Sequence, residues 1–332
     1  MSLLTDYDAL LIDLDGTVYR GAAAVPGAAD AIQAAHQAGV GVRFVTNNAS
    51  RSPDDVAGHL NRLGIPAKPA EITTSAQAGA ALLVDRIAPG DTVLVLGTDA
   101  LVAAVAAHGY PTVRAADDQV KAVIQGFSPD IGWRDLAEAA VAIRAGALWV
   151  ACNVDVTLPT ERGLLPGSGA LVAAVRAATG ATPLVAGKPE RPLMDDAIRA
   201  EGATRPLAVG DRLDTDIAGA VNVGVDSLLV LTGVSTPTDL LAAPVSQRPT
   251  YVAADLRGVA AQVDDNAIAA QPGWRVEITH DTLTLSGDGD DIAALRALCA
   301  AWWPGGGGPV RVRPLGGAAA GVVSRLGLPA AS

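Results

Sequence analysis

The stretch Asp13-Leu14-Asp15-Gly16-Thr17 gives the strongest indication of the fold of this chain. It follows the apolar run Ala9-Leu10-Leu11-Ile12, which predicts a buried strand. The first carboxylate then lies at the carboxyl end of that strand, and the second lies in a turn made by Gly16. Ligands of open α/β sheets bind at this edge. Two acids placed there can divide one reaction, because one can attack the substrate while the other transfers protons.

The remaining sequence alternates between strand and helix patterns. A helix is predicted over residues 27–38, a strand over 41–45, and a second helix after Ser52, which is a suitable N-cap. This rhythm predicts a parallel sheet with right-handed crossovers. It starts again in the middle of the chain, with strands expected at 92–96, 121–125 and 147–151. The middle block is therefore interpreted as an inserted α/β domain.

These patterns predict the domain organisation. We expect an α/β protein with a Rossmann-like parallel-sheet core, an inserted α/β cap domain and a small C-terminal α+β extension. The core is expected to occupy residues 1–76 and 183–261, and the inserted domain residues 77–182. The extension, residues 262–332, shows a hairpin, a helix and a strand pattern, and its role stays open.

Composition limits the classes of function. The chain has 332 residues, of which 50% are hydrophobic and only 3% aromatic, so a large core is built mainly from Ala, Val, Leu and Ile. A net charge of −11 argues against a nucleic-acid partner, although it leaves room for a small phosphorylated substrate. Two distant cysteines, no signal-peptide pattern and no apolar run of about 20 residues predict a cytoplasmic protein without a membrane span.

Four short motifs occur in order, each next to a predicted strand or helix end. They are Asp13-x-Asp15-Gly16-Thr17, Thr46-Asn47-Asn48, Lys188-Pro189 and Gly210-Asp211-Arg212-Leu213-Asp214-Thr215-Asp216. This set resembles the haloacid dehalogenase superfamily of phosphatases in residue types, order and strand-end context. The resemblance covers about residues 7–260, so it leaves the C-terminal extension out.

The position of the inserted domain indicates which branch of this superfamily the chain resembles. Only a short helix separates Asp15 from Thr46, whereas 142 residues (188 − 46) separate Thr46 from Lys188. The chain is therefore similar to the branch with a large α/β cap of the C2 type, which includes the NagD, nitrophenylphosphatase, phosphoglycolate phosphatase and glycerol 3-phosphate phosphatase group. The stretch from Cys152 to Leu171 resembles the cap loop and following helix of the last two.

The resemblance implies a Mg²⁺-dependent phosphatase, and it assigns roles to four acids. Asp13 is the expected nucleophile, forming an aspartyl phosphate, and also a metal ligand through its carboxylate. Asp15 is the expected general acid and base, and its backbone carbonyl the second metal ligand. Asp211 supplies a further carboxylate to the metal. Asp216 is expected to support the metal shell through water or Lys188, although capping of the next helix is an alternative role.

The resemblance also assigns residues to the phosphate, and charged residues of the cap loop are candidates for contacts with the leaving group. Thr46 and the adjoining backbone amides, those of Asn47 and Asn48, are expected to hold phosphate oxygens, and Lys188 to balance the negative charge. In the cap loop over residues 153–169, the expected substrate-binding residues are Asp155, Glu161 and Arg162.

These cap residues guide the choice of substrate. Hydrogen bonds from a polyol to Asp155 or Glu161 favour glycerol 3-phosphate, which is the preferred prediction. A contact with Arg162 would favour a carboxylate substrate such as phosphoglycolate, and a broad sugar or nucleotide phosphatase is a further alternative. In the simplest alternative, Glu161 and Arg162 merely pair with each other at the surface.

Other functions fit the motifs less well. A dehalogenase of the same superfamily needs no acid at the position of Asp15, and phosphomutases usually carry their insertion before Thr46. A non-catalytic phosphate-sensing or scaffold protein would not need the intact acids and Lys188. The sequence leaves open whether two copies form a homodimer.

Overall fold

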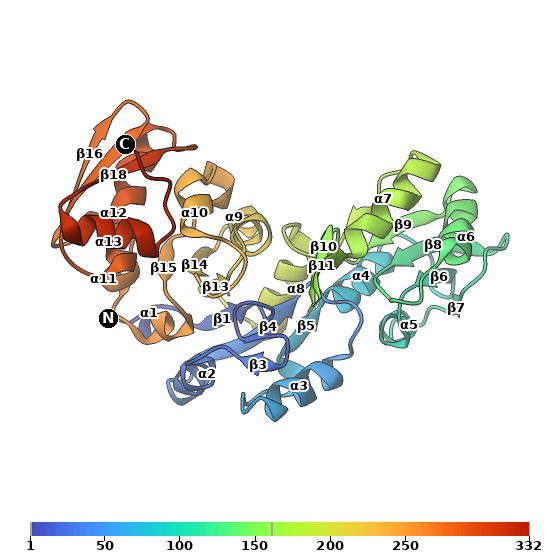
Figure 1. Ribbon diagram of the computed structural model, residues 1–332. Helices are drawn as coiled ribbons and strands as arrows, with labels where there is room; N and C mark the ends of the chain where they lie inside the picture. Colours follow the sequence, from blue (N-terminus) through green and yellow to red (C-terminus); the bar gives the residue numbers. More distant parts are fainter. Residues whose placement is uncertain (1, 161, 332) are drawn as a thin grey trace. The chain divides into compact units, whose positions relative to one another are not determined.

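The computed structural model describes residues 2–160 and 162–331, in which the chain divides into two units. The first unit combines residues 1–42 with 203–332, and the second comprises residues 43–202. Figure 1 shows the elements of both units along the chain.

Four parallel strands form the centre of the first unit, in the order β15-β14-β13-β1. Their bounds are β1 (Ala9–Ile12), β13 (Pro206–Gly210), β14 (Asp226–Val230) and β15 (Tyr251–Ala253). Nearly all of their side chains are buried, as expected for a parallel sheet covered on both faces. The register aligns Ile12 with Val209, so the residues that follow both strands emerge at the same edge.

Short helices surround these strands. They are α1 (Leu3–Asp6), α2 (Ala28–Gln37), α9 (Ala218–Val223), α10 (Pro237–Ala242) and α11 (Val263–Asn266), with the helical turns η2 (Leu213–Ile217), η3 (Val245–Gln247) and η4 (Leu256–Ala260). A two-residue hairpin pair, β2 (Tyr19–Arg20) and β3 (Ala23–Ala24), follows the first motif.

Within the first unit, the C-terminal extension combines helices with a small sheet, which is the predicted α+β arrangement. Its three strands are ordered β16-β17-β18, with the first pair antiparallel and the second parallel. The elements are β16 (Trp274–Thr279), β17 (Thr282–Gly287), α12 (Asp291–Trp302), η5 (Trp303–Gly305), β18 (Arg311–Leu315) and α13 (Gly317–Arg325). Buried residues of α12, such as Leu295 and Leu298, share one hydrophobic cluster with Leu240 and Val252 of the parallel-sheet region.

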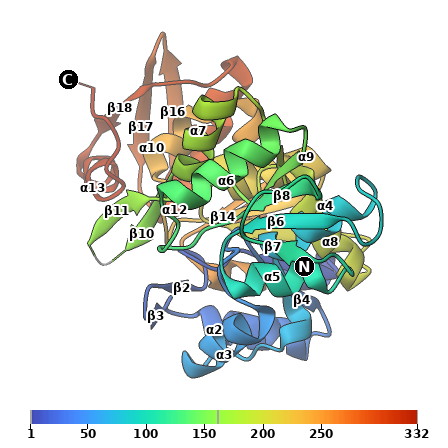
Figure 2. The same ribbon diagram turned by 90° about the vertical axis from the view of Figure 1, so that its right-hand side faces the viewer.

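The second unit contains a five-stranded parallel sheet, ordered β12-β9-β8-β6-β7. The strands are β6 (Thr92–Leu96), β7 (Thr112–Val113), β8 (Val120–Gln125), β9 (Leu148–Ala151) and β12 (Leu184–Val185). One face packs against α4 (Ser75–Val84) and α5 (Asp99–Ala106), and the other against α6 (Trp133–Arg144) and α7 (Ser168–Thr179). This layered arrangement can be followed in Figure 2.

The second unit also holds the residues around the second and third motifs. They lie on or near β4 (Gly41–Thr46), α3 (Pro53–Arg62), η1 (Pro69–Glu71), β5 (Ile72–Thr74) and α8 (Arg191–Glu201). Strands β4 and β5 pair in parallel. Ser52 caps α3 as predicted, because its side chain accepts the backbone N–H of Asp55 and the Asp55 carboxylate accepts that of Ser52.

The α/β class with a Rossmann-like parallel sheet is confirmed, and most predicted elements lie within a residue or two of their observed bounds. The stretch 153–169 differs, since it contains a hairpin of β10 (Thr157–Thr160) and β11 (Gly163–Pro166) rather than a loop alone. Prolines in both strands hid the alternating pattern. The boundaries of the inserted domain stay a prediction. No helix in the described residues has the length and apolar character that crossing a bilayer requires.

Candidate functional site

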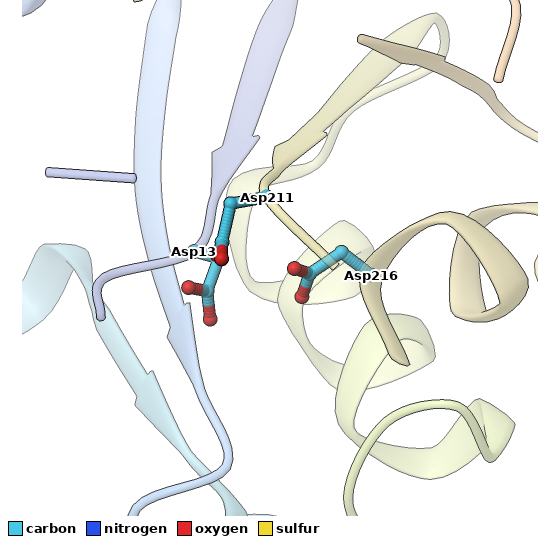
Figure 3. A group of neighbouring side chains, drawn as sticks. All are labelled: Asp13, Asp211 and Asp216. Atoms are coloured by element: carbon cyan, nitrogen blue, oxygen red, sulfur yellow. The ribbon is translucent and has the colours of Figure 1, made fainter. Parts of the chain in front are cut away.

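Three carboxylates of the first unit lie together at the carboxyl edge of its sheet (Figure 3). Asp13 directly follows β1 and Asp211 directly follows β13, and one oxygen from each, with one from Asp216, lies within 4.8 Å of the others. Asp211 and Asp216 are buried, whereas Asp13 is half-buried. The backbone N–H of Asp13 donates to the carbonyl of Val209 at 2.8 Å, which extends the β1–β13 ladder to the acid itself. The parallel pairing thus brings the first and fourth motifs together.

The Asp211 side chain is held by two hydrogen bonds and by two glycines that leave room for its carboxylate. Its side chain is fully buried, with the Thr17 hydroxyl donating to Oδ1 at 3.3 Å and the backbone N–H of Val234 donating to Oδ2 at 2.6 Å. A Cβ atom at Gly16 would lie 2.5 Å from Oδ2, and one at Gly233 would lie 1.8 Å from it. Both positions therefore require glycine while the carboxylate keeps this place.

Asp216 and its sequence neighbour Asp214 have different surroundings. The π-helical turn η2 places the Asp216 carboxylate so that Oδ2 accepts the backbone N–H of Arg212 at 3.1 Å. Asp214 is exposed and accepts two hydrogen bonds from the Arg212 guanidinium, at 3.0 and 2.8 Å, which lower its pKa. A Cβ at Gly210 would lie 2.3 Å from that of Asp216. Of the two acids, Asp216 is the one that belongs to the carboxylate group.

Asp15 is the exposed acid of the first motif. Its carboxylate oxygen Oδ2 accepts the Tyr19 hydroxyl at 3.2 Å, and the backbone N–H of Gly16 donates to the Tyr19 carbonyl at 2.8 Å. The Thr232 hydroxyl donates to the Gly16 carbonyl at 2.6 Å. The turn that presents Asp15 is therefore fixed from both sides, while the acid itself stays accessible for proton transfer.

The second and third motifs meet in the second unit. Lys188 is 3% exposed, and its ammonium donates to the Val45 carbonyl at 2.8 Å. The Asn47 side chain contacts the Lys188 backbone and the Asp155 carboxylate, which brings a cap-loop residue to the end of β4. Thr46 is buried and accepts the Asn48 N–H at 3.1 Å, so its own hydroxyl hydrogen stays available to a ligand.

For two of the remaining predicted residues, Asn48 and Arg162, the structure shows local turn contacts. The Asn48 side-chain oxygen accepts the backbone N–H of Ser50 at 2.8 Å, a local turn contact. Arg162 is exposed near the tip of the β10–β11 hairpin, where its backbone N–H donates to the Thr160 hydroxyl. Glu161 lies outside the described residues.

Sequence reasoning missed the contacts that hold Asp211. Thr17 was visible only as the end of the first motif, and Gly233 and Val234 lie more than 20 residues after Asp211 with no motif around them. Gly210 was visible only as the start of the fourth motif, and Gly233 has no sequence signal, because the need for glycine there comes from a contact with the distant Asp211.

The donor chemistry of the carboxylate group fits a hard divalent cation. Carboxylate oxygens are the ligands that Mg²⁺ prefers. Three such groups within 4.8 Å also repel one another strongly unless positive charge lies near them.

Comparisons with known families agree with this geometry. Residues 10–111 match the haloacid dehalogenase-like hydrolases, and residues 185–259 match a second family of the same hydrolases. Residues 271–328 match a GCN5-related N-acetyltransferase-like domain, which gives the C-terminal extension a family that the sequence reading did not identify.

Individual relatives are similar over long stretches. D-glycerol 3-phosphate phosphatase of Mycobacterium tuberculosis is 49% identical over 323 residues, covering 95% of this chain and 91% of the relative. Acid sugar phosphatase of Staphylococcus saprophyticus is 37% identical over 79% of this chain and all of the relative. The crystal structure of the M. tuberculosis glycerol phosphate phosphatase in complex with magnesium has a TM-score of 0.94 at 47% identity, covering 99% of both chains.

Proposed function

Because the chain belongs to the haloacid dehalogenase-like phosphatases of the NagD group, we propose that it hydrolyses glycerol 3-phosphate with Mg²⁺ through an aspartyl-phosphate intermediate. The observation that carries the proposal is the carboxylate group at the ends of β1 and β13, with Asp13 as its half-buried, accessible member. An attacking oxygen needs such access, whereas a purely structural acid does not.

The proposed metal ligands are the carboxylates of Asp13 and Asp211 and the backbone carbonyl of Asp15. Asp216 offers an oxygen to the same group and is proposed to support the metal shell through water. Bound Mg²⁺ would neutralise the repulsion between the phosphate dianion and the attacking carboxylate.

The two chemical steps use Asp13 and Asp15. A carboxylate oxygen of Asp13 forms a bond to phosphorus while the bond from phosphorus to the leaving oxygen breaks, and Asp15 gives its proton to the departing alkoxide. In the second step Asp15 takes a proton from a water molecule, whose oxygen attacks phosphorus and releases the Asp13 carboxylate. Asp15 thus ends in the protonated form with which it started.

The proposed phosphate-binding groups are the Thr46 hydroxyl, the neighbouring backbone amides and the Lys188 ammonium, and the residues 77–182 are proposed as the cap over the leaving group. The half-buried Asp155 carboxylate can accept a hydrogen bond from a polyol hydroxyl, which supports glycerol 3-phosphate. Arg162 is proposed to act on carboxylate-bearing substrates, and phosphoglycolate is the alternative. The two buried free thiols are compatible with a cytoplasmic location, which we also propose.

Phosphate release from a panel of metabolites tests the function. The purified chain should hydrolyse glycerol 3-phosphate with a higher kcat/KM than phosphoglycolate, sugar phosphates, nucleoside monophosphates or 4-nitrophenyl phosphate. Excess chelator should abolish release, and added Mg²⁺ should restore it. Full activity in chelator would exclude the metal mechanism, and preference for phosphoglycolate would replace the proposed substrate with the alternative.

A further inference from the structure

The side chain of Asn47 uses all of its hydrogen-bonding groups within the protein. Its Nδ2 donates to the Lys188 carbonyl at 3.0 Å and to the Asp155 carboxylate at 3.2 Å, and its Oδ1 accepts the Lys188 backbone N–H at 2.8 Å. An amide nitrogen has two hydrogens to donate, and both have partners here. Asn47 therefore cannot donate to a substrate without releasing one of these contacts.

The backbone of Asn47 is tied to the same region. Its carbonyl accepts the Ser75 hydroxyl at 2.6 Å and the Asn153 side-chain amide at 2.7 Å. The side-chain oxygen of Asn153 in turn accepts the backbone N–H of Asp155 at 3.1 Å. Asn153 is 5% exposed, so these contacts are largely shielded from water. The loop that carries Asp155 is thus connected to residue 47 through two separate routes.

The neighbouring backbone is shaped to allow this approach. A Cβ atom at Gly187 would lie 2.6 Å from the Asn47 Oδ1 and 2.7 Å from the Cys152 carbonyl. Glycine at position 187 lets the Lys188 N–H and the Asn47 amide come within hydrogen-bond distance. Lys188 follows immediately, and its ammonium bonds back to Val45.

We propose that Asn47 is a positioning residue that fixes the Asp155 carboxylate to the Lys188 backbone and so sets the preference for the leaving group. This inference rests on the proposed function, because it assigns Asp155 to a polyol substrate. It gives the Asn47 side chain a role separate from the phosphate contact proposed for the backbone amides next to Thr46. Asp155 lies at the base of a hairpin whose second strand, β11, is exposed.

A comparison of two substrates in a mutant cycle tests the proposal. Asn47→Ala should lower kcat/KM for glycerol 3-phosphate about tenfold or more beyond its effect on 4-nitrophenyl phosphate, since a contact to a charged group is lost. Asp155→Ala should lower the same substrate ratio. In the Asp155→Ala background, Asn47→Ala should leave the ratio unchanged, because the residue through which Asn47 acts is gone. Asn47→Ala also removes the contacts with the Lys188 backbone, which should lower activity with both substrates. This shared loss should appear as a lower kcat.

Asn61→Ala is the matched control. The Asn61 amide also donates to two backbone carbonyls, at 2.8 Å each, and accepts one backbone N–H at 3.3 Å, but it does so at the end of α3. Its loss should lower thermal stability and leave the substrate ratio unchanged. If Asn47→Ala does not fold, Asn47→Asp keeps the shape and the Lys188 N–H contact while losing both donations, and the same ratios apply.

Two results would overturn the proposal. Equal losses of kcat/KM for both substrates in Asn47→Ala would mean that Asn47 has a structural role only. If Asn47→Ala lowers the substrate ratio in the Asp155→Ala background as much as it does in the wild type, Asn47 contacts the substrate itself. The wild-type chain separates these results from failure of the proposed function. If it prefers another phosphorylated metabolite, the glycerol 3-phosphate assignment falls, and the cycle is measured with the preferred metabolite.

Discussion

Replacing Gly233 with alanine should disable the site although no charged residue is substituted. The backbone at Gly233 lies outside the left-handed region, so alanine causes no conformational strain there. The new methyl group would lie 1.8 Å from Oδ2, 2.3 Å from Cγ and 2.7 Å from Cβ of Asp211. The substitution therefore acts on the Asp211 side chain.

The expected magnitude follows from these distances. Real Cβ contacts essentially never fall below 3.0 Å, so the Asp211 oxygen and the methyl group must separate by at least about 1.2 Å (3.0 − 1.8). A misplacement of about 1 Å can cost roughly a hundredfold in catalysis. The Val234 N–H bond to Oδ2, now 2.6 Å, would also be broken or bent, and a hydrogen bond to a charged group contributes about 1.5–3 kcal/mol.

The assay is kcat/KM for the best substrate as a function of Mg²⁺ concentration, together with thermal unfolding. Gly233→Ala should show about a hundredfold lower kcat/KM, a higher Mg²⁺ requirement and reduced stability. Gly317→Ala is the control, since a methyl group at the start of α13 would meet no atom within 4 Å. Wild-type activity and Mg²⁺ dependence in Gly233→Ala would show that the segment around Gly233 does not fix Asp211.

Three further substitutions test the nucleophile, the tip of the β10–β11 hairpin and an ion pair of the C-terminal extension. Asp13→Asn should keep the thermal unfolding profile and reduce turnover below detection, and substantial activity in the purified variant would remove Asp13 as the nucleophile. Arg162→Ala should lower kcat/KM about ten- to a hundredfold for a carboxylate-bearing substrate and much less for 4-nitrophenyl phosphate; equal losses would indicate an effect on folding or closure. The Arg325 guanidinium bonds both carboxylate oxygens of Asp291 and lowers the pKa of that acid. Its stabilisation is therefore present above the unfolded pKa of about 3.9 and is lost as the pH falls through the depressed value. Asp291→Asn should be less stable than wild type at pH 7 and not at low pH, measured by denaturant unfolding; a pH-independent difference would contradict this account.

Much of the first unit could be predicted because its signals are local. The apolar run before Asp13 and the one before Asp211 each mark a buried strand, and parallel strands place their carboxyl ends at one edge. The structure places both acids at that edge with Asp216 beside them. The resemblance had already indicated Asp216 rather than Asp214, and the structure adds how the two acids separate: the π-helical turn η2 directs Asp216 toward the carboxylate group, while Asp214 pairs with Arg212.

The remaining features depend on contacts between distant segments. Nothing near Gly233 in the sequence announces that an Asp211 oxygen will occupy the space of its missing side chain. The Asn47 contacts join segments more than 100 residues apart, so the sequence offered only the residue type and a strand-end position. The β10–β11 hairpin escaped prediction because its prolines break the alternation on which strand prediction depends.

The cluster shared by α12 and the parallel-sheet region has a consequence for how the C-terminal extension depends on the rest of the chain. Residues 271–328 match a family of their own, yet the buried Arg296 of α12 donates to the Val252 carbonyl at 2.9 Å, and Leu295 and Leu298 pack with Leu240. Removing the extension would expose apolar side chains of α10 and β15 to water and leave that carbonyl without its guanidinium. The extension and the parallel-sheet region therefore share one hydrophobic core, and we expect them to unfold together. Grafting this extension onto another protein would also require the apolar surface that α10 and β15 present to α12.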